Sequence, residues 1–166
     1  LFSALIHPEN GAYEQTIHIL FEWNQVVDAT YYNLQASEQQ SFDNISLDVQ
    51  EETTVYVATE SFSWDNAYNW RVRPIYNDGS IGNWSETSNF TIGQKRLPDL
   101  VVDPYDDNLV TDGVTVFSQF SPWFIVGAID KEGNEIWNTD TAYMNHINEF
   151  GQMYGIKGAD PEAGGN

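Results

Sequence analysis

The sequence contains no cysteine and few basic residues, and each shortage excludes certain functions. Without cysteine the chain has no disulfide, no thiolate metal site and no cysteine nucleophile. Only six Lys and Arg residues stand against 25 Asp and Glu, which gives a formal net charge of −19. Such a charge repels the phosphate backbone of nucleic acid and the anionic surface of a membrane. No apolar run approaches the roughly 18 residues of a membrane-spanning helix, so we expect neither a nucleic-acid partner nor membrane insertion.

The sequence also lacks the short motifs of common enzymes. It has no P-loop, no Gly-rich dinucleotide turn, no serine-nucleophile elbow and no paired histidines with helical spacing. The three histidines are His7, His18 and His146, and none has a paired carboxylate at a recognisable spacing. We expect His146 to be an ordinary surface or loop residue. We therefore predict no catalytic residues and no organic cofactor.

Apolar and aromatic residues, in contrast, are plentiful. Hydrophobic residues make up 41% of the chain and aromatic residues 14%, which is too apolar for a disordered tail. The acidic composition, with many Asn, Ser and Thr residues, favours an extracellular or cell-surface protein. The chain begins at Leu1 without a methionine or an apolar leader, so we expect that a targeting peptide has been removed.

Five segments of the first ninety residues have the alternating pattern of β-strands: 16–23, 31–36, 53–58, 67–75 and 87–92. Turn-forming residues such as Asp, Asn, Gly and Pro separate them. Several short strands at this spacing predict an antiparallel sandwich. The residues expected to face its core are Ile17, Ile19, Phe21, Trp23, Tyr32, Leu34, Ala36, Val55, Val57, Tyr68, Trp70, Val72, Phe90 and Ile92.

The order of several motifs within this region points to a family. Phe21-Glu22-Trp23 comes first, Tyr68-Asn69-Trp70-Arg71-Val72-Arg73 follows, and Trp84-Ser85 precedes Phe90. Together they resemble a fibronectin type III domain of the bacterial kind, over residues 1–93. The resemblance implies that Tyr68 is a tyrosine corner, whose hydroxyl bonds back to the upstream backbone.

Residues 94–111 contain two of the six basic residues and two prolines, and they predict a linker. Residues 112–166 then predict a small second β unit, with strands at 113–117, 124–129 and 150–156. A turn at 130–134 leads to Glu135-Ile136-Trp137.

The stretches 112–117 and 129–137 resemble the opening blade of an arylsulfotransferase-type β-propeller. A propeller needs about four to eight four-stranded blades, so this blade would be incomplete. Those sulfotransferases use a histidine nucleophile on later blades, and no motif here carries that role onto His146. The expected fold class is thus all-β: a fibronectin-III/Ig-like antiparallel sandwich followed by a short propeller-blade-like unit.

A cluster of hard oxygen ligands lies in the predicted linker. Asp103, Asp106, Asp107 and Asp112 fall within ten residues, and carboxylate oxygens are the ligands that calcium prefers. The spacing is not that of an EF-hand. The alternatives are a calcium site that stiffens the junction and a solvated acidic linker.

Two arginines and two tryptophans of the predicted sandwich form another candidate group. Arg71 and Arg73 lie two apart on one strand face, and we expect Trp84 to lie over a guanidinium plane. This contact would stabilise the sandwich. The functional alternative makes Trp64, Trp84 and nearby tyrosines a sugar-stacking platform.

Three N-glycosylation triplets begin at Asn44, Asn83 and Asn89. The first and second are predicted to lie in loops, and the third in a strand, where modification is less favourable.

Three functions remain open. The first is a non-catalytic extracellular spacer or docking module, which forms the front part of a larger secreted protein and binds a protein or glycan surface. The second is a structural subunit of an extracellular filament or surface layer, which joins copies of itself by β-strand addition. The third is the N-terminal fragment of an arylsulfotransferase-like propeller enzyme.

Overall fold

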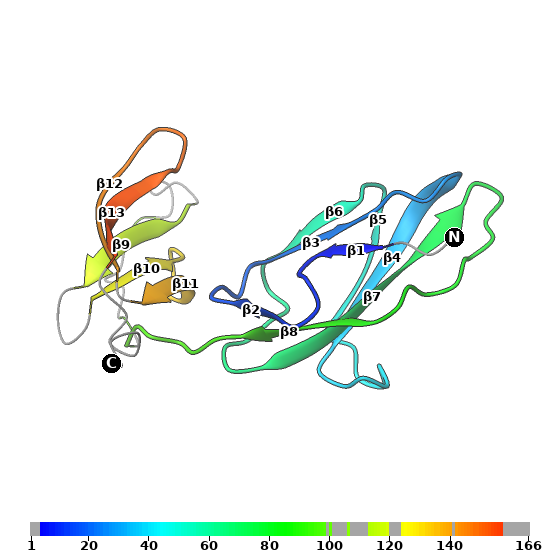
Figure 1. The fold of residues 1–166 in the computed structure, drawn as a ribbon, viewed down its shortest axis with the longest axis horizontal. Coiled ribbons are helices and arrows are strands. Elements are labelled where there is room, and N and C mark those ends of the chain that lie inside the picture. Colours follow the sequence, from blue (N-terminus) through cyan, green and yellow to red (C-terminus); the bar gives the residue numbers. More distant parts are fainter. Residues whose placement is uncertain are drawn as a thin grey trace, which may run out of the picture. The chain divides into compact units, whose positions relative to one another are not determined.

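The computed structural model describes residues 4–98, 100, 106, 113–119, 124–140 and 142–157. Within these residues the protein is all-β, with thirteen strands and no helix (Figure 1). The chain divides into two compact units, residues 1–94 and 95–166. The described residues contain no helix of the length and apolarity needed to cross a membrane.

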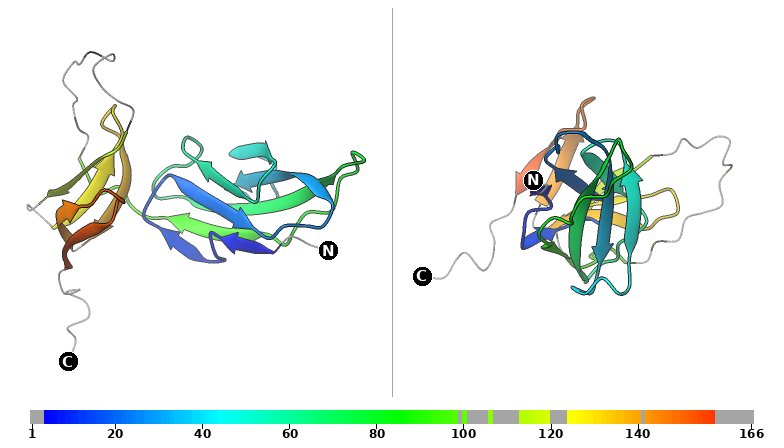
Figure 2. Two further views of the ribbon diagram at one scale, coloured as in Figure 1. Left: turned by 90° about the horizontal axis from the view of Figure 1, so that it is seen from above. Right: turned by 90° about the vertical axis from the view of Figure 1, so that its right-hand side faces the viewer.

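The first unit is a sandwich of a three-stranded and a five-stranded sheet, seen as two layers in Figure 2. Neighbouring strands are antiparallel, except that β2 pairs with β8 in parallel. The three-stranded sheet has the order β1 (Leu5–His7), β3 (Ile19–Trp23), β6 (Val55–Ala58). The five-stranded sheet has the order β2 (Ala12–Glu14), β8 (Ser88–Ile92), β7 (Ala67–Tyr76), β4 (Ala29–Ser37), β5 (Leu47–Glu51).

The core between the two sheets is aromatic. Phe21, Trp70 and Phe90 have no exposed surface, because the two-residue period of a strand turns every second side chain inward. The ring of Phe21 meets that of Trp70 edge-on, with centroids 5.0 Å apart, and that of Phe90 at 6.0 Å. Such edge-on ring contacts stabilise the core beyond the effect of burying apolar surface. The predicted inward faces of β3, β4, β7 and β8 are confirmed.

The predicted face of β6 is wrong. Val55 and Val57 are 45% and 52% exposed, whereas Ala58 is buried. Pairing with β3 is the reason, since Phe21 lies opposite Tyr56 and Ile19 opposite Ala58. Directly opposed residues share a face of the sheet, so the buried side of β3 forces Tyr56 and Ala58 inward. Valine at the two remaining positions suits a strand but does not select the face.

Two of the predicted turns depend on aspartate in an unusual conformation. Asp28 and Asp65 have φ values of 63° and 62°, in the left-handed region that Asp tolerates better than most residues. The strands β1, β2 and β5 were not predicted. Strands β1 and β2 have only three residues each, too few to show an alternation, whereas the alternation of Leu47-Asp48-Val49-Gln50 in β5 was missed.

The second unit contains two small antiparallel sheets. A three-stranded sheet has the order β11 (Glu135–Asp140), β10 (Ile125–Ile129), β9 (Thr115–Gln119), and a hairpin joins β12 (Ala142–Ile147) to β13 (Met153–Lys157). The predicted turn at 130–134 is present. Asp130 Oδ1 accepts the backbone N–H groups of Glu132 and Asn134 at 3.0 and 2.8 Å. Strand β12 was not predicted from the sequence. It contains His146, which therefore lies in a strand.

The start of the predicted linker packs on the second unit. Leu97 is only 5% exposed, and a Cβ added at Gly127 would come within 2.8 Å of Leu97 Cδ1. The backbone N–H of Leu97 donates to Glu135 Oε2 at 2.7 Å, and that of Arg96 to the same oxygen at 3.0 Å. Glycine at 127 therefore makes room for the incoming chain. Most of the predicted linker beyond residue 98 lies outside the described residues.

Candidate functional site

The outer face of the five-stranded sheet carries two paired rows of polar side chains. Strands β4 and β7 are its central neighbours, and their register places Gln35 opposite Arg71 and Asn33 opposite Arg73. Leu34 and Val72, between these pairs, are fully buried. The alternation along both strands therefore places the two arginines together on the outer face.

The two guanidinium groups are held by aromatic rings. The Arg71 guanidinium carbon lies 3.9 Å from the centroid of the Phe42 ring and 4.2 Å from that of Trp84. The Arg73 carbon lies 4.3 Å from the Trp84 centroid. These are cation–π distances, and the predicted contact of Trp84 with the arginines is confirmed. We call Phe42, Arg71, Trp84 and Arg73 the arginine–aromatic row.

Neutral amides orient the same guanidinium groups. Arg71 donates to Gln35 Oε1 from Nη2 at 2.8 Å and from Nε at 3.3 Å. Arg73 Nε donates to Asn33 Oδ1 at 3.2 Å. Gln35 Nε2 in turn donates to Asp48 Oδ2 at 3.0 Å. The nearest carboxylate of this network therefore reaches the arginines only through an amide.

The electrostatic environment of the row is unusual for so acidic a chain. Within the described residues, neither Arg71 nor Arg73 takes part in an ion pair. Burial lowers the pKa of Arg71, the neighbouring charge of Arg73 lowers it further, and Asp48 acts in the opposite direction. The row is thus a local concentration of positive charge without a direct counter-ion.

The two tryptophans of the sugar platform considered from the sequence lie in different surroundings. Trp64 is partly buried and packs against the core of the sandwich, whereas Trp84 lies in the arginine–aromatic row on the outer face of the sheet. The sugar platform stays an untested alternative.

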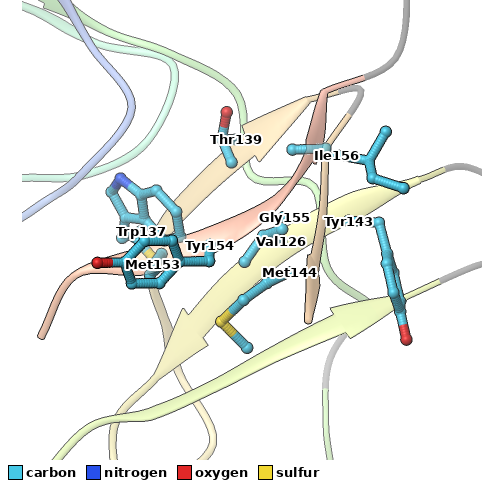
Figure 3. Close-up of a pocket in the computed structure, with 10 residues that line it drawn as sticks. Val126, Trp137, Thr139, Tyr143, Met144, Met153, Tyr154, Gly155 and Ile156 are labelled. Carbon is cyan, nitrogen blue, oxygen red and sulfur yellow. The ribbon is translucent and has the colours of Figure 1, made fainter. Parts of the chain in front are cut away.

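A second candidate is an apolar hollow in the second unit, shown in Figure 3. Its volume is about 220 Å³. Trp137 and Tyr154 lie on one side of it and Tyr143 and Ile156 on the other. The lining comes from β10, β11 and the β12–β13 hairpin: Val126, Trp137, Thr139, Ala142, Tyr143, Met144, Met153, Tyr154, Gly155 and Ile156. Among the described residues that line it, Tyr143 and Tyr154 are the titratable ones.

The acidic cluster falls largely beyond the part of the chain that the structure describes. Asp103, Asp107 and Asp112 lie outside it, and Asp106 is described and exposed. Among the described residues, no group of three or more His, Cys, Asp or Glu side chains could hold a metal ion. The calcium prediction stays untested.

The histidines are scattered. His7 Nε2 lies 3.6 Å from Glu14 Oε1, a partnership that their spacing of seven residues did not reveal because β1 and β2 join different sheets. His146 is exposed, and its ring centroid lies 6.3 Å from that of Tyr154. Neither arrangement gives a nucleophile with a base.

The three glycosylation triplets are at the surface. Asn44, Asn83 and Asn89 are exposed, and only Asn89 lies in a strand, β8. Its Nδ2 donates to Asn10 Oδ1 at 2.8 Å, so this amide is already engaged.

Comparison with known proteins adds little. No family model matches the sequence, and no curated protein matches it. Among solved structures, a β-1,2-glucanase from Parabacteroides distasonis is similar at 20% identity and a TM-score of 0.42. The match covers 57% of this chain and 13% of the glucanase. A likeness of this degree supports no conclusion about function.

Proposed function

We propose that the chain is a non-catalytic extracellular module, in which the first unit acts as a spacer and docking surface. The observation that carries the proposal is the closed aromatic core of the sandwich. Phe21, Trp70 and Phe90 are completely buried between two sheets, an arrangement that gives the rigid body a spacer needs. A fibronectin type III-like module would serve such a role.

Two features support the likeness to a fibronectin type III domain. The sandwich has the sheets β1–β3–β6 and β8–β7–β4–β5, with β2 added beside β8. The hydroxyl of Tyr68, at the start of β7, accepts the backbone N–H of Ser63 at 3.1 Å. This is the bond expected of a tyrosine corner.

The native mass tests the proposal. Light scattering on protein purified without denaturant, with the intact mass taken on the same sample, should give a monomer of 18.9 kDa. Large ordered assemblies would contradict a stand-alone module. A native chain much heavier than 18.9 kDa would instead place these residues at the front of a longer protein.

A second candidate, a filament or surface-layer subunit, is favoured by strand β13. Met153, Tyr154 and Ile156 are 47%, 54% and 67% exposed, and within the described residues β13 pairs only with β12. Exposed apolar edge strands pair readily with another chain. Ile156→Lys should abolish assembly if β13 is the joining strand, whereas Val27→Lys, at an exposed position of the first unit, should leave it intact.

A third candidate, the front of an arylsulfotransferase-like propeller, is favoured by a repeat within the second unit. Asp130 and Asn148 each accept two backbone N–H groups of the following turn at 2.8–3.0 Å. Each is followed by a glycine with positive φ, Gly133 at 86° and Gly151 at 76°. Two hairpins with the same turn chemistry suit a series of blades. Transfer of sulfate from an aryl sulfate by the full-length protein would test this candidate.

A further inference from the structure

We propose that the arginine–aromatic row is a binding site for a single oxyanion, the carboxylate or sulfate group of an otherwise uncharged ligand. The proposal rests on the docking function suggested above and gives that function a specific surface. Three properties of the row favour such a ligand: its hydrogen-bond donors, its charge and the rigidity of its side chains.

Most N–H donors of the two guanidinium groups are uncommitted. A guanidinium carries five donors. Arg71 uses Nε and one Nη2 hydrogen on Gln35, and Arg73 uses Nε on Asn33. No other acceptor for either arginine occurs among the described residues. The planar fork that remains suits the two oxygens of a carboxylate or sulfate, and such charge-assisted pairs are about twice as strong as neutral hydrogen bonds.

The row has no directly paired counter-ion, because the nearest carboxylate of its network, that of Asp48, bonds to Gln35 and attracts Arg71 only at longer range. Arg71 and Arg73 are two of the six basic residues in a chain with 25 acidic ones, yet the nearest acceptors are amide oxygens. Each arginine repels the other, and a bound oxyanion would relieve that repulsion. The overall charge of −19 repels a long polyanion, whereas a single oxyanion responds mainly to charges within the Debye length of about 8 Å. At the row these include the attracting charges of Arg71 and Arg73 and the opposing charge of Asp48. This favours an isolated oxyanion over an acidic polymer.

The side chains of the row are already ordered. Phe42 is 7% exposed and supports the Arg71 guanidinium from one side, and Trp84 contacts both arginines. Immobilising a long side chain on binding costs conformational entropy. Two arginines held in place beforehand avoid most of this loss.

The arginine Nε–Hε signals in a nitrogen–proton NMR spectrum test the proposal directly. The chain has only three arginines, Arg71, Arg73 and Arg96, so Arg96 in the second unit is an internal control. Sodium sulfate and sodium acetate are added in separate titrations, with sodium chloride at matched ionic strength as the baseline. We expect the Arg71 and Arg73 signals to shift with one saturable isotherm while Arg96 stays in place. The arm that saturates identifies the oxyanion.

Three outcomes would overturn the proposal: no saturation with either salt, equal shifts at Arg96, or the same shifts with chloride. Arg73→Lys keeps the charge but loses the planar fork, and it should weaken binding at least tenfold. Arg96→Lys is the matched control and should bind like the parent. If the protein forms large assemblies but its arginine signals saturate, the module is contradicted and the oxyanion site is supported. If it is a monomer whose signals do not saturate, the module is supported and the oxyanion site is contradicted.

Discussion

Replacing Tyr32 with phenylalanine should destabilise the sandwich more than replacing Tyr68, although sequence reasoning singled out only Tyr68. Each hydroxyl accepts one backbone N–H. Tyr32 takes that of Val26 at 2.8 Å and Tyr68 that of Ser63 at 3.1 Å. Both tyrosines are 2% exposed, so the two substitutions remove the same atom from equally buried rings.

The difference arises from the donor that each substitution leaves behind. Val26 is 5% exposed, and its hydrogen bond is buried, so water cannot replace the lost acceptor. An orphaned buried donor costs about 1–3 kcal/mol. Ser63 is exposed, and water can take over there, which limits the loss to the net value of a hydrogen bond, about 0.5–1.5 kcal/mol. For a domain of this size each kcal/mol lowers the Tm by about 4–8 °C.

Thermal unfolding of the full chain, followed by near-ultraviolet circular dichroism, measures the two Tm values. Amide hydrogen exchange at Val26 and Ser63 provides a second measurement, because each substitution should lower protection at its own donor. If Tyr68→Phe lowers the Tm as much as Tyr32→Phe, or more, the reasoning from donor burial is refuted.

Two further predictions concern the carboxylates of Glu135 and Asp78. Glu135→Gln should destabilise the second unit by about 1.5–3 kcal/mol. The reason is that an amide N–H group would face donors that now bond to the carboxylate, including Asn138 Nδ2 at 2.7 Å. The NMR signals of β10 and β11, followed during heating, measure the loss of stability. Hydrogen bonds from the side chain and backbone of Ser80 lower the pKa of Asp78, so this contact is complete at neutral pH and is lost as the pH falls through that lowered pKa. In an NMR titration, Ser80→Ala should raise the Asp78 midpoint, because the hydroxyl donor is lost while the backbone N–H of residue 80 remains.

Much of the first unit follows from the sequence alone. Strict alternation over β3, β4, β7 and β8 identifies both the strands and their buried faces, because a strand with one face in a core must place its apolar residues at every second position. The same alternation placed Arg71 and Arg73 together on an outer face. The contact with Trp84 was expected from a neighbouring strand, but Trp84 lies in the segment that precedes β8 and reaches the arginines from there.

Other features depend on partners that are distant in the sequence. The face of β6 was predicted wrongly because Val55 and Val57 have β propensity whichever way they point, and only the pairing of β6 with β3 turned them outward. The support of Arg71 by Phe42 could not be foreseen, since Phe42 reaches the row from a loop in the left-handed conformation, at a φ of 58°.

The sequence by itself thus determined the all-β class, the core of the sandwich and the identity of the charged residues, since these depend on local periodicity and composition. The tertiary structure decided which groups meet. It left Arg71 and Arg73 among amides instead of carboxylates, and it buried Glu135 against the backbone of Arg96 and Leu97. Such contacts arise from strand register and loop path, which bring together residues whose spacing along the chain carries no signal.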